Sequence, residues 1–143
     1  TSKRYRYRVS TAPVVPPFTR PYVHQVRARL NVALMRREAQ TLVGRHDFRA
    51  FARASPRQAN ATRTVTDVSL TRFGQEIRLD ITGNGFLHTM VRSVAGTLID
   101  VGRGRLPPGT VRRMLRSGDR RLAGTTAPGK GLTLVAVDYA KGR

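Results

Sequence analysis

Apolar and polar residues alternate along two parts of the chain, and a period of two is typical of a strand with one buried face. Residues 3–10, KRYRYRVS, place two tyrosines and a valine on one side and three arginines on the other. Residues 64–72 and 76–82 alternate in the same way on either side of Gly74, a residue that favours a tight turn. These two segments are predicted to form a hairpin.

Apolar residues recur every three or four positions in other segments, which is the period of a helix. The first such segment runs from Tyr22 to Val43, with Pro21 and Gly44 in the places where helices favour these residues. A second helix is predicted within residues 85–104, and a short third one after the prolines at 107–108.

Residues 45–61 are predicted to run from a short aromatic segment into a polar loop, and residues 132–139, LTLVAVDY, to form the last strand. The element order is therefore β-α-β-β-α-(α)-β. This is the order of the split βαβ, or ferredoxin-like, arrangement, in which helices pack on one face of an antiparallel sheet. With no internal repeat and no long linker, residues 1–143 are predicted to form a single α+β domain.

The net charge of the chain narrows the class of molecule that it is expected to bind. The 143 residues include 27 lysines and arginines but only 8 acidic residues, a net charge of +19. A bias toward arginine codons would explain arginine in place of lysine, but it would not explain so few acids. Nucleic acid is favoured over a membrane surface, because no segment combines a basic face with exposed bulky apolar residues. The absence of cysteine excludes disulfides and cysteine-ligated metal sites.

Few motifs suggest familiar catalytic chemistry. The three histidines are too scattered to predict a metal site. His46 and Asp47 are adjacent, and neighbours on an extended segment point apart, so they are not predicted to form a catalytic pair. Asp47 is instead predicted to cap a loop, with Phe48 and Phe51 in the core. No glycine pair matches a phosphate-binding or dinucleotide-binding fingerprint.

Two places remain as candidate sites. Tyr5 and Tyr7 share one face of the first predicted strand, where they could pack in the core or offer a ring that stacks on a base. Arg92 lies at the boundary of the buried face of the second predicted helix, four residues after His88 and one turn before Gly96.

Two interpretations of Arg92 stay open. Its side chain could snorkel from the edge of an amphipathic helix. Alternatively, its charge is held for a function. No acidic residue is close to it in the sequence, and a desolvated arginine without a partner is costly. The second interpretation therefore predicts a carboxylate or phosphate brought by another part of the structure.

Five segments occur in an order and spacing typical of one enzyme family: KRYRYRV, GRHDFRAFAR, RTVTDVSL, GNGFLHTMVRSVAGTLIDVGRGRLPP and DRRLAGTTAPGKGLTLVAVDY. Over residues 3–139 the chain resembles the C-terminal half of the tRNA pseudouridine synthase A family. The resemblance implies the C-terminal half of a pseudouridine synthase fold, which agrees with the split βαβ order.

The resemblance also implies an activity. Members of this family convert uridines at positions 38, 39 and 40 of the tRNA anticodon stem-loop to pseudouridine, without a metal or organic cofactor. A catalytic aspartate attacks the extruded nucleotide, the glycosidic bond breaks, and the base turns and rejoins through carbon. The expected protein is a cytoplasmic homodimer whose partner is tRNA and which does not associate with a membrane.

The same resemblance assigns residues. Tyr5 is expected to pack on the target base and to help remove its C5 proton, Arg92 to pair with the catalytic aspartate, and Leu132 to border the base. The further residues expected to bind the RNA are Arg4, Arg6 and His88.

The chain also departs from the family. The catalytic aspartate belongs to a Gly-Arg-Thr-Asp-type motif of the N-terminal half, which this sequence lacks, and Asp47 matches a different segment. Ser93 stands where asparagine is frequent, and Thr133 where an aromatic residue is usual. The chain is therefore predicted to be half of an enzyme and inactive alone. The alternatives are a stand-alone basic RNA-binding module and a basic protein-interaction domain.

Overall fold

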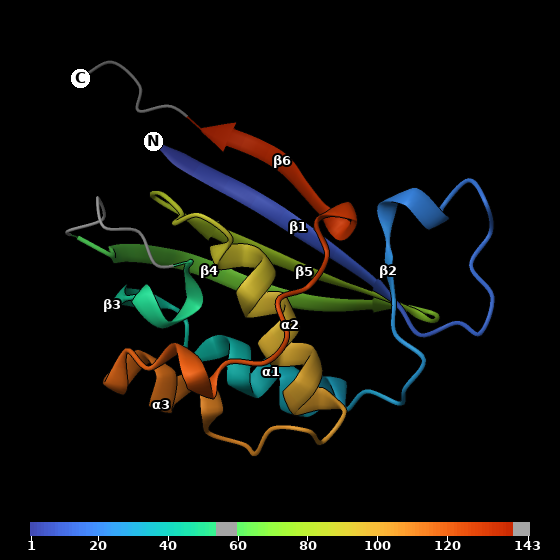
Figure 1. Cartoon of the computed structure of the whole chain (residues 1–143). Helices are drawn as coiled ribbons and strands as arrows, with labels where there is room; N and C mark the ends of the chain where they lie inside the picture. Colours follow the sequence, from blue (N-terminus) through green and yellow to red (C-terminus); the bar gives the residue numbers. More distant parts are fainter. Residues whose placement is uncertain (54–59, 139–143) are drawn as a thin grey trace.

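Four long strands form the centre of the sheet in the computed structural model, which describes residues 1–53 and 60–138 (Figure 1). They are β1 (Ser2–Ser10), β4 (Thr62–Phe73), β5 (Glu76–Gly83) and β6 (Leu132–Asp138). Their order across the sheet is β6-β1-β5-β4, and every neighbouring pair is antiparallel. β1 and β4 are thus parallel with β5 between them, which confirms the predicted split βαβ arrangement.

The predicted hairpin is confirmed as β4 and β5, whose last pair before the turn is Phe73 and Glu76. Gly74 adopts a φ of +59°, the left-handed region that glycine favours. A bulge between Val65 and Asp67 shifts the register, so Val65 and Val68 both face the core although they are three residues apart.

Two short strands at the edges of the sheet are not predicted from the sequence. β2 (His24–Gln25) pairs in parallel with the end of β1, and β3 (Gly44–Asp47) pairs in antiparallel with the start of β4. Segments of two and four residues are too short to show a period, so the pattern of apolar positions cannot identify them.

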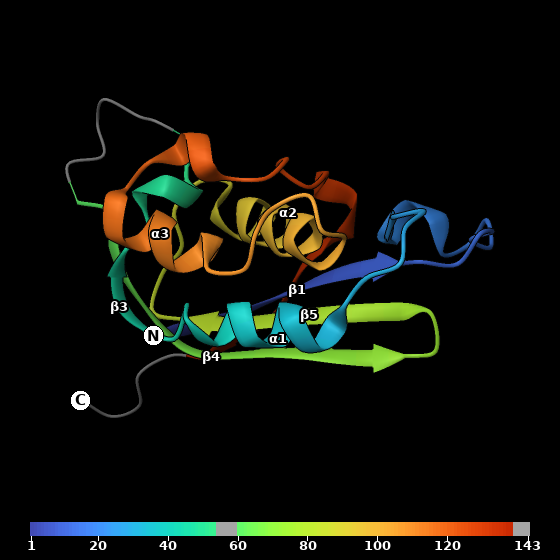
Figure 2. The same ribbon diagram turned by 90° about the horizontal axis from the view of Figure 1, so that it is seen from below.

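The helices are α1 (Val32–Gln40), α2 (Met90–Gly102) and α3 (Thr110–Ser117). α2 packs against β1, and α1 packs against both β4 and α2. Figure 2 shows α2 and α3 layered on one side of the sheet. Four 3-10 turns complete the described elements: η1 (Arg20–Tyr22), η2 (Arg49–Phe51), η3 (Arg120–Leu122) and η4 (Gly129–Gly131).

The prediction of a helix from Tyr22 to Val43 is wrong for its first ten residues. The helix begins at Val32, because the side chain of Asn31 accepts a hydrogen bond from the backbone N–H of Leu34 and caps the first turn. The preceding segment runs through η1 and β2 in extended and turn conformations. Its valines, Val23 and Val26, flank β2 and are buried as loop residues, so the helical spacing of the segment is a coincidence.

The second predicted helix also begins later than expected. Thr89 adopts a φ of +62°, a left-handed conformation that a helix cannot include, and α2 starts at the next residue. Phe86 and His88 therefore lie before the helix. The predicted placement of His88 four residues from Arg92 on one helical flank is wrong for this reason.

The aromatic segment after Gly44 folds as β3 followed by η2. Phe48 and Phe51 are fully buried, as predicted, and the Asp47 carboxylate accepts the backbone N–H of Arg49, which confirms the predicted loop cap. The rest of the predicted polar loop includes residues 54–59, and the last predicted strand includes Tyr139; these lie outside the described residues. Among the helices of the described ranges, none is long and apolar enough to cross a membrane.

Candidate active site

Strand β1 separates two chemically different surfaces. Tyr5, Tyr7 and Val9 point to the side of the sheet that the helices cover, and the alternate arginines point to the open side. The candidate residues of the first strand are therefore divided between two faces, and only the tyrosines can reach α2.

Tyr7 is a core residue. Its ring is fully buried, and its hydroxyl donates a hydrogen bond to the carbonyl of Pro128. Burial raises the pKa of this phenol, and the positive charge of Arg92 partly offsets the rise. Tyr7 therefore serves as a neutral hydrogen-bond donor to the chain segment that leads into β6, and it cannot offer its ring to a base.

Tyr5 has a different environment although it lies on the same face. Its ring is half-buried and meets Phe86 edge to face, with the ring centroids 5.0 Å apart. Its neighbours across the strands are Ile81 on β5 and Leu134 on β6, and the Leu134 side chain is 47% exposed. Of the two tyrosines, Tyr5 is the one whose ring is accessible and supported from behind by another ring.

Leu132 begins β6 and pairs with Tyr7 rather than with Tyr5. Its side chain is half-buried and packs against the core cluster. Gly131, which precedes it, lies so close to the Tyr7 ring that a β-carbon would come within 2.7 Å of the phenol carbon Cζ. Leu132 thus lies at the edge of the sheet, on the tyrosine side.

Arg92 is half-buried on α2, at the boundary of the buried face as the helical phase predicts. Its Nε donates to the carbonyl of Ala127 at 2.8 Å, and its own carbonyl accepts the backbone N–H of Ala127 at 3.1 Å. The side chain is therefore held against a loop. Its partner is a carbonyl, and no acidic side chain of the described ranges forms an ion pair with it.

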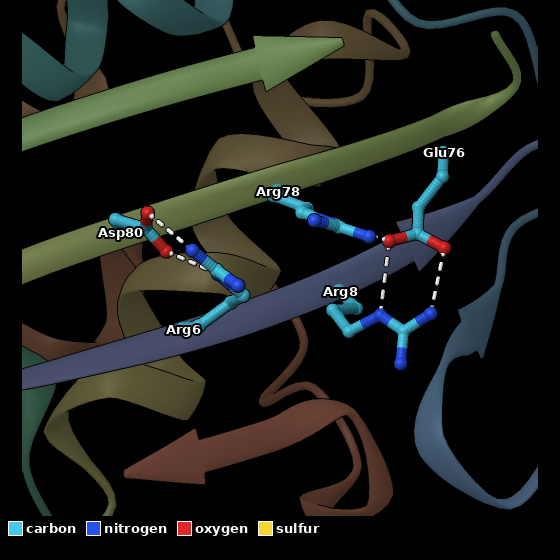
Figure 3. A network of polar contacts seen from close by, with 5 residues as sticks. All are labelled: Arg6, Arg8, Glu76, Arg78 and Asp80. Carbon is cyan, nitrogen blue, oxygen red and sulfur yellow. Dashed lines mark hydrogen bonds and ion pairs between the residues drawn. The ribbon is translucent and has the colours of Figure 1, made fainter. Parts of the chain in front are cut away.

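The open face of the sheet holds a network of ion pairs instead of a site (Figure 3). Arg6 binds Asp80 through two nitrogens at 2.8 and 3.1 Å. Glu76 accepts two hydrogen bonds from Arg8 at 2.9 Å and one from Arg78 at 2.7 Å. The hydrogen bond from Arg8 is the main reason why the pKa of Glu76 falls to about 2.

Arg4 and Arg6 therefore lie on the opposite face of the sheet from Tyr5 and α2. Arg4 is exposed on the open face, and Arg6 is occupied by Asp80. His88 is exposed just before α2, where its carbonyl accepts the backbone N–H of Arg53 at 3.4 Å. No group of three metal-ligating side chains is found among the residues that the structure describes.

Sequence reasoning missed two contributors to this region. Phe86, which falls within the range predicted as the second helix, is the ring that supports Tyr5. The second is the chain from Ala127 to Gly131, which leads into β6 and accepts the Tyr7 hydroxyl through Pro128; its only signal in the sequence was the density of glycine before Leu132.

Comparison with known proteins identifies the family. The model of a tRNA pseudouridine synthase family matches residues 39–140. The tRNA pseudouridine synthase A of Brevibacillus brevis is 42% identical over 137 residues, and that of Bacillus subtilis is 43% identical over 137 residues. Both alignments cover 96% of this chain. The chain belongs to the tRNA pseudouridine synthase family.

The alignments cover 56% of the length of each of these two relatives. A third tRNA pseudouridine synthase A, from Halalkalibacterium halodurans, is 44% identical over 131 residues, which is 92% of this chain and 50% of that protein. The chain thus spans about half the length of the curated relatives that it matches. Membership of the synthase family agrees with the α+β fold, whereas the roles of individual residues remain predictions.

Proposed function

We propose that this chain supplies part of the active site of an enzyme that isomerises uridine to pseudouridine in the tRNA anticodon stem-loop, at positions 38 to 40. The observation that carries the proposal is that a partly exposed aromatic ring and a held arginine both lie on the helix side of β1. Tyr5 has its ring supported by Phe86, and Arg92 has its Nε fixed by Ala127.

Uridine isomerisation needs the target base outside the helical stack, because its reacting atoms are otherwise inaccessible. The bond from the sugar C1′ to N1 breaks, a bond from C1′ to C5 forms, the proton on C5 is lost and N1 gains a proton. A partly exposed tyrosine suits this reaction, since its ring can pack on the extruded base while its hydroxyl lies near C5. Leu132, at the neighbouring strand edge, would border the base.

Arg92 would orient the catalytic carboxylate. Its Nε is used within the chain, and its two terminal nitrogens make no hydrogen bond to the described residues, so they can form a paired contact with a carboxylate. We infer that this carboxylate is an aspartate from a part of the enzyme outside residues 1–143, within the additional length that the relatives have. The chain alone would then be inactive.

The charge of +19 supports tRNA as the partner, since phosphates are the counter-charge that so basic a surface attracts. We extend the proposal to a cytoplasmic homodimer, as the resemblance implies. The arginines of the open face are a weaker basis for RNA binding than the charge alone suggests, because Arg6, Arg8 and Arg78 are already paired with carboxylates.

The test combines this chain with a separately produced N-terminal half of a relative that carries the catalytic aspartate. Pseudouridine formation in an anticodon stem-loop RNA is expected from the mixture, not from either part alone, and not when the aspartate is replaced by asparagine. RNA binding without any conversion by the mixture would contradict the proposal and favour a stand-alone RNA-binding module. No RNA binding even at low salt would favour a protein-interaction domain.

A further inference from the structure

The loop from Ala123 to Pro128 lies along one flank of α2, and side chains of the helix hold its backbone. The N–H of Gly124 donates to the Thr97 hydroxyl at 3.2 Å. The N–H of Thr125 donates to the Asp100 carboxylate at 3.0 Å. Figure 1 shows this segment passing α2 on its way from η3 to η4. We call it the α2 loop.

The α2 loop and the helix meet backbone to backbone. A β-carbon on Gly96 would lie 1.6 Å from the Thr125 carbonyl oxygen, and one on Gly124 would lie 2.6 Å from the Asp100 carboxylate. Only a helix with glycine at position 96 can therefore accept the loop at this depth. The close approach fixes how far the loop can shift along α2.

Asp100 is an unusual residue for this position. Only 7% of it is exposed, yet it is an acid in a chain that has few acids and many arginines on its surface. No ion pair joins it to an arginine of the described ranges. Its carboxylate instead accepts the backbone N–H of Thr125. A hydrogen bond to a charged acceptor is about twice as strong as one between neutral groups, so Asp100 is a stronger tether of the loop than the Thr97 hydroxyl.

The other end of the α2 loop holds Arg92. Ala127 exchanges two hydrogen bonds with Arg92, one through its carbonyl and one through its N–H, and the carbonyl of Pro128 accepts the hydroxyl of Tyr7. Asp100 and Arg92 are eight residues, or roughly 12 Å, apart along the helix. The loop joins them by a second route, with Thr125 and Ala127 separated by one residue.

We propose that Asp100 is a positioning residue for Arg92. By fixing Thr125, its carboxylate sets the place of the Ala127 carbonyl, and that carbonyl fixes Nε of Arg92 so that the terminal nitrogens face the reacting groups. The inference rests on the proposed function in one respect, since it takes Arg92 to be the residue that orients the catalytic carboxylate. Asp100 itself touches neither the base nor that carboxylate.

The first experiment needs no activity. In the chain itself, Asp100→Ala is expected to shift the NMR resonance of the Arg92 Nε–H and to speed its exchange with water roughly five- to tenfold, as expected for a lost hydrogen bond. Glu38→Ala is the matched control, because Glu38 is also a buried acid, 6% exposed, whose carboxylate accepts backbone N–H groups of Gly109 and Val111. An equal effect of both variants on Arg92, or none from Asp100→Ala, would overturn the proposal.

Asp100→Asn keeps an oxygen at the same place and is expected to restore most of the Arg92 signal. If Asp100→Ala does not fold, Asp100→Leu takes its place, because leucine fills a similar volume but offers no oxygen to the Thr125 N–H, and an unchanged Arg92 signal in that variant contradicts the proposal. In the assembled enzyme, Asp100→Ala should lower kcat by about tenfold to a hundredfold with little change in KM. An assembled enzyme without activity would refute the proposed function, while the NMR result would still decide whether Asp100 positions Arg92.

Discussion

Tyr5 and Tyr7 show how two identical residues on one face of one strand acquire different tasks. The sequence left core packing and base stacking open for both. Tyr7 lies under the chain that enters β6 and has no exposed surface. Tyr5 pairs with Leu134 further along β6, and its ring packs against Phe86. Whether each ring is buried or accessible depends on the residues that cover it. These residues come from distant parts of the sequence, which the periodicity of one strand cannot predict.

The two hydroxyls should therefore respond differently to removal. Tyr7→Phe leaves the Pro128 carbonyl without its donor and is expected to lower the free energy of unfolding by about 1–2 kcal/mol. Tyr5→Phe should change stability by less than about 0.5 kcal/mol, because its ring keeps its contact with Phe86, and should slow turnover in the assembled enzyme. Urea denaturation of both variants checks this, and a larger stability loss for Tyr5→Phe would contradict the assignment.

Gly96 gives the sharpest steric prediction at the residue scale. Gly96→Ala places a methyl group on the Thr125 carbonyl, which is backbone and cannot rotate away, so a loss of about 3 kcal/mol in the free energy of unfolding is expected. Gly85→Ala is the matched control, since its nearest neighbours are Arg63 side-chain atoms at 3.6 Å, an ordinary contact. Similar unfolding midpoints for the two alanine variants would show that the α2 loop does not lie where described.

Among the elements, the strands of the hairpin and the short helix α3 follow from the sequence, because a single periodic pattern covers each of them. The beginnings of α1 and α2 do not follow, because they depend on single residues at the boundary. Asn31 caps one helix through its side chain, and Thr89 stops the other from extending backward through its left-handed conformation. The apolar residues before each boundary recur at helical spacing although they do not lie in a helix.

The start of α1 can be tested directly. Asn31→Ala is expected to lower the free energy of unfolding by about 1 kcal/mol, because the first turn loses its cap. Asn31→Asp should retain nearly all of the stability, since aspartate caps as well as asparagine does. A helix that ran from Tyr22 would have position 31 in its interior, and the aspartate variant would then give no advantage over alanine in thermal denaturation.

The ion pairs between β1 and β5 make the open face of the sheet sensitive to acid. The pKa of Glu76 is about 2 in the folded chain against an ordinary value of 4.5, so its contribution is complete above about pH 4.5 and is lost as the pH falls toward 2. Glu76→Gln should reduce the loss in the free energy of unfolding between pH 4.5 and pH 2 by about 1 kcal/mol. The figure is modest because water reaches the ion pair. Asp67→Asn, at an exposed position, is the control, and an equal flattening by both would contradict the assignment.

At the scale of the whole molecule, the split βαβ fold follows from the order of elements, because that order leaves few ways to cover one face of a sheet. Tyr5 and Arg92 were singled out by the strand and helix patterns, whereas Leu132 and the role of each candidate residue followed from the resemblance. The contacts of the α2 loop could not be predicted, because they join backbone groups of residues 124–127 to residues 96–100, which are distant in the sequence. The glycines of this segment were the only sign of these contacts in the sequence.

The proposed function depends most on Arg92, which we propose to be held by the chain for a carboxylate outside residues 1–143. The most direct measurement is pseudouridine formation by the enzyme assembled from this chain and a half that carries the catalytic aspartate, with Arg92→Ala against Arg112→Ala, an exposed arginine of α3. Arg92→Ala is expected to lose at least about a hundredfold in kcat, as for removal of a preorganised charged group, while Arg112→Ala is expected to keep nearly full activity. Unchanged turnover with Arg92→Ala in a folded, RNA-binding protein would contradict the proposed function.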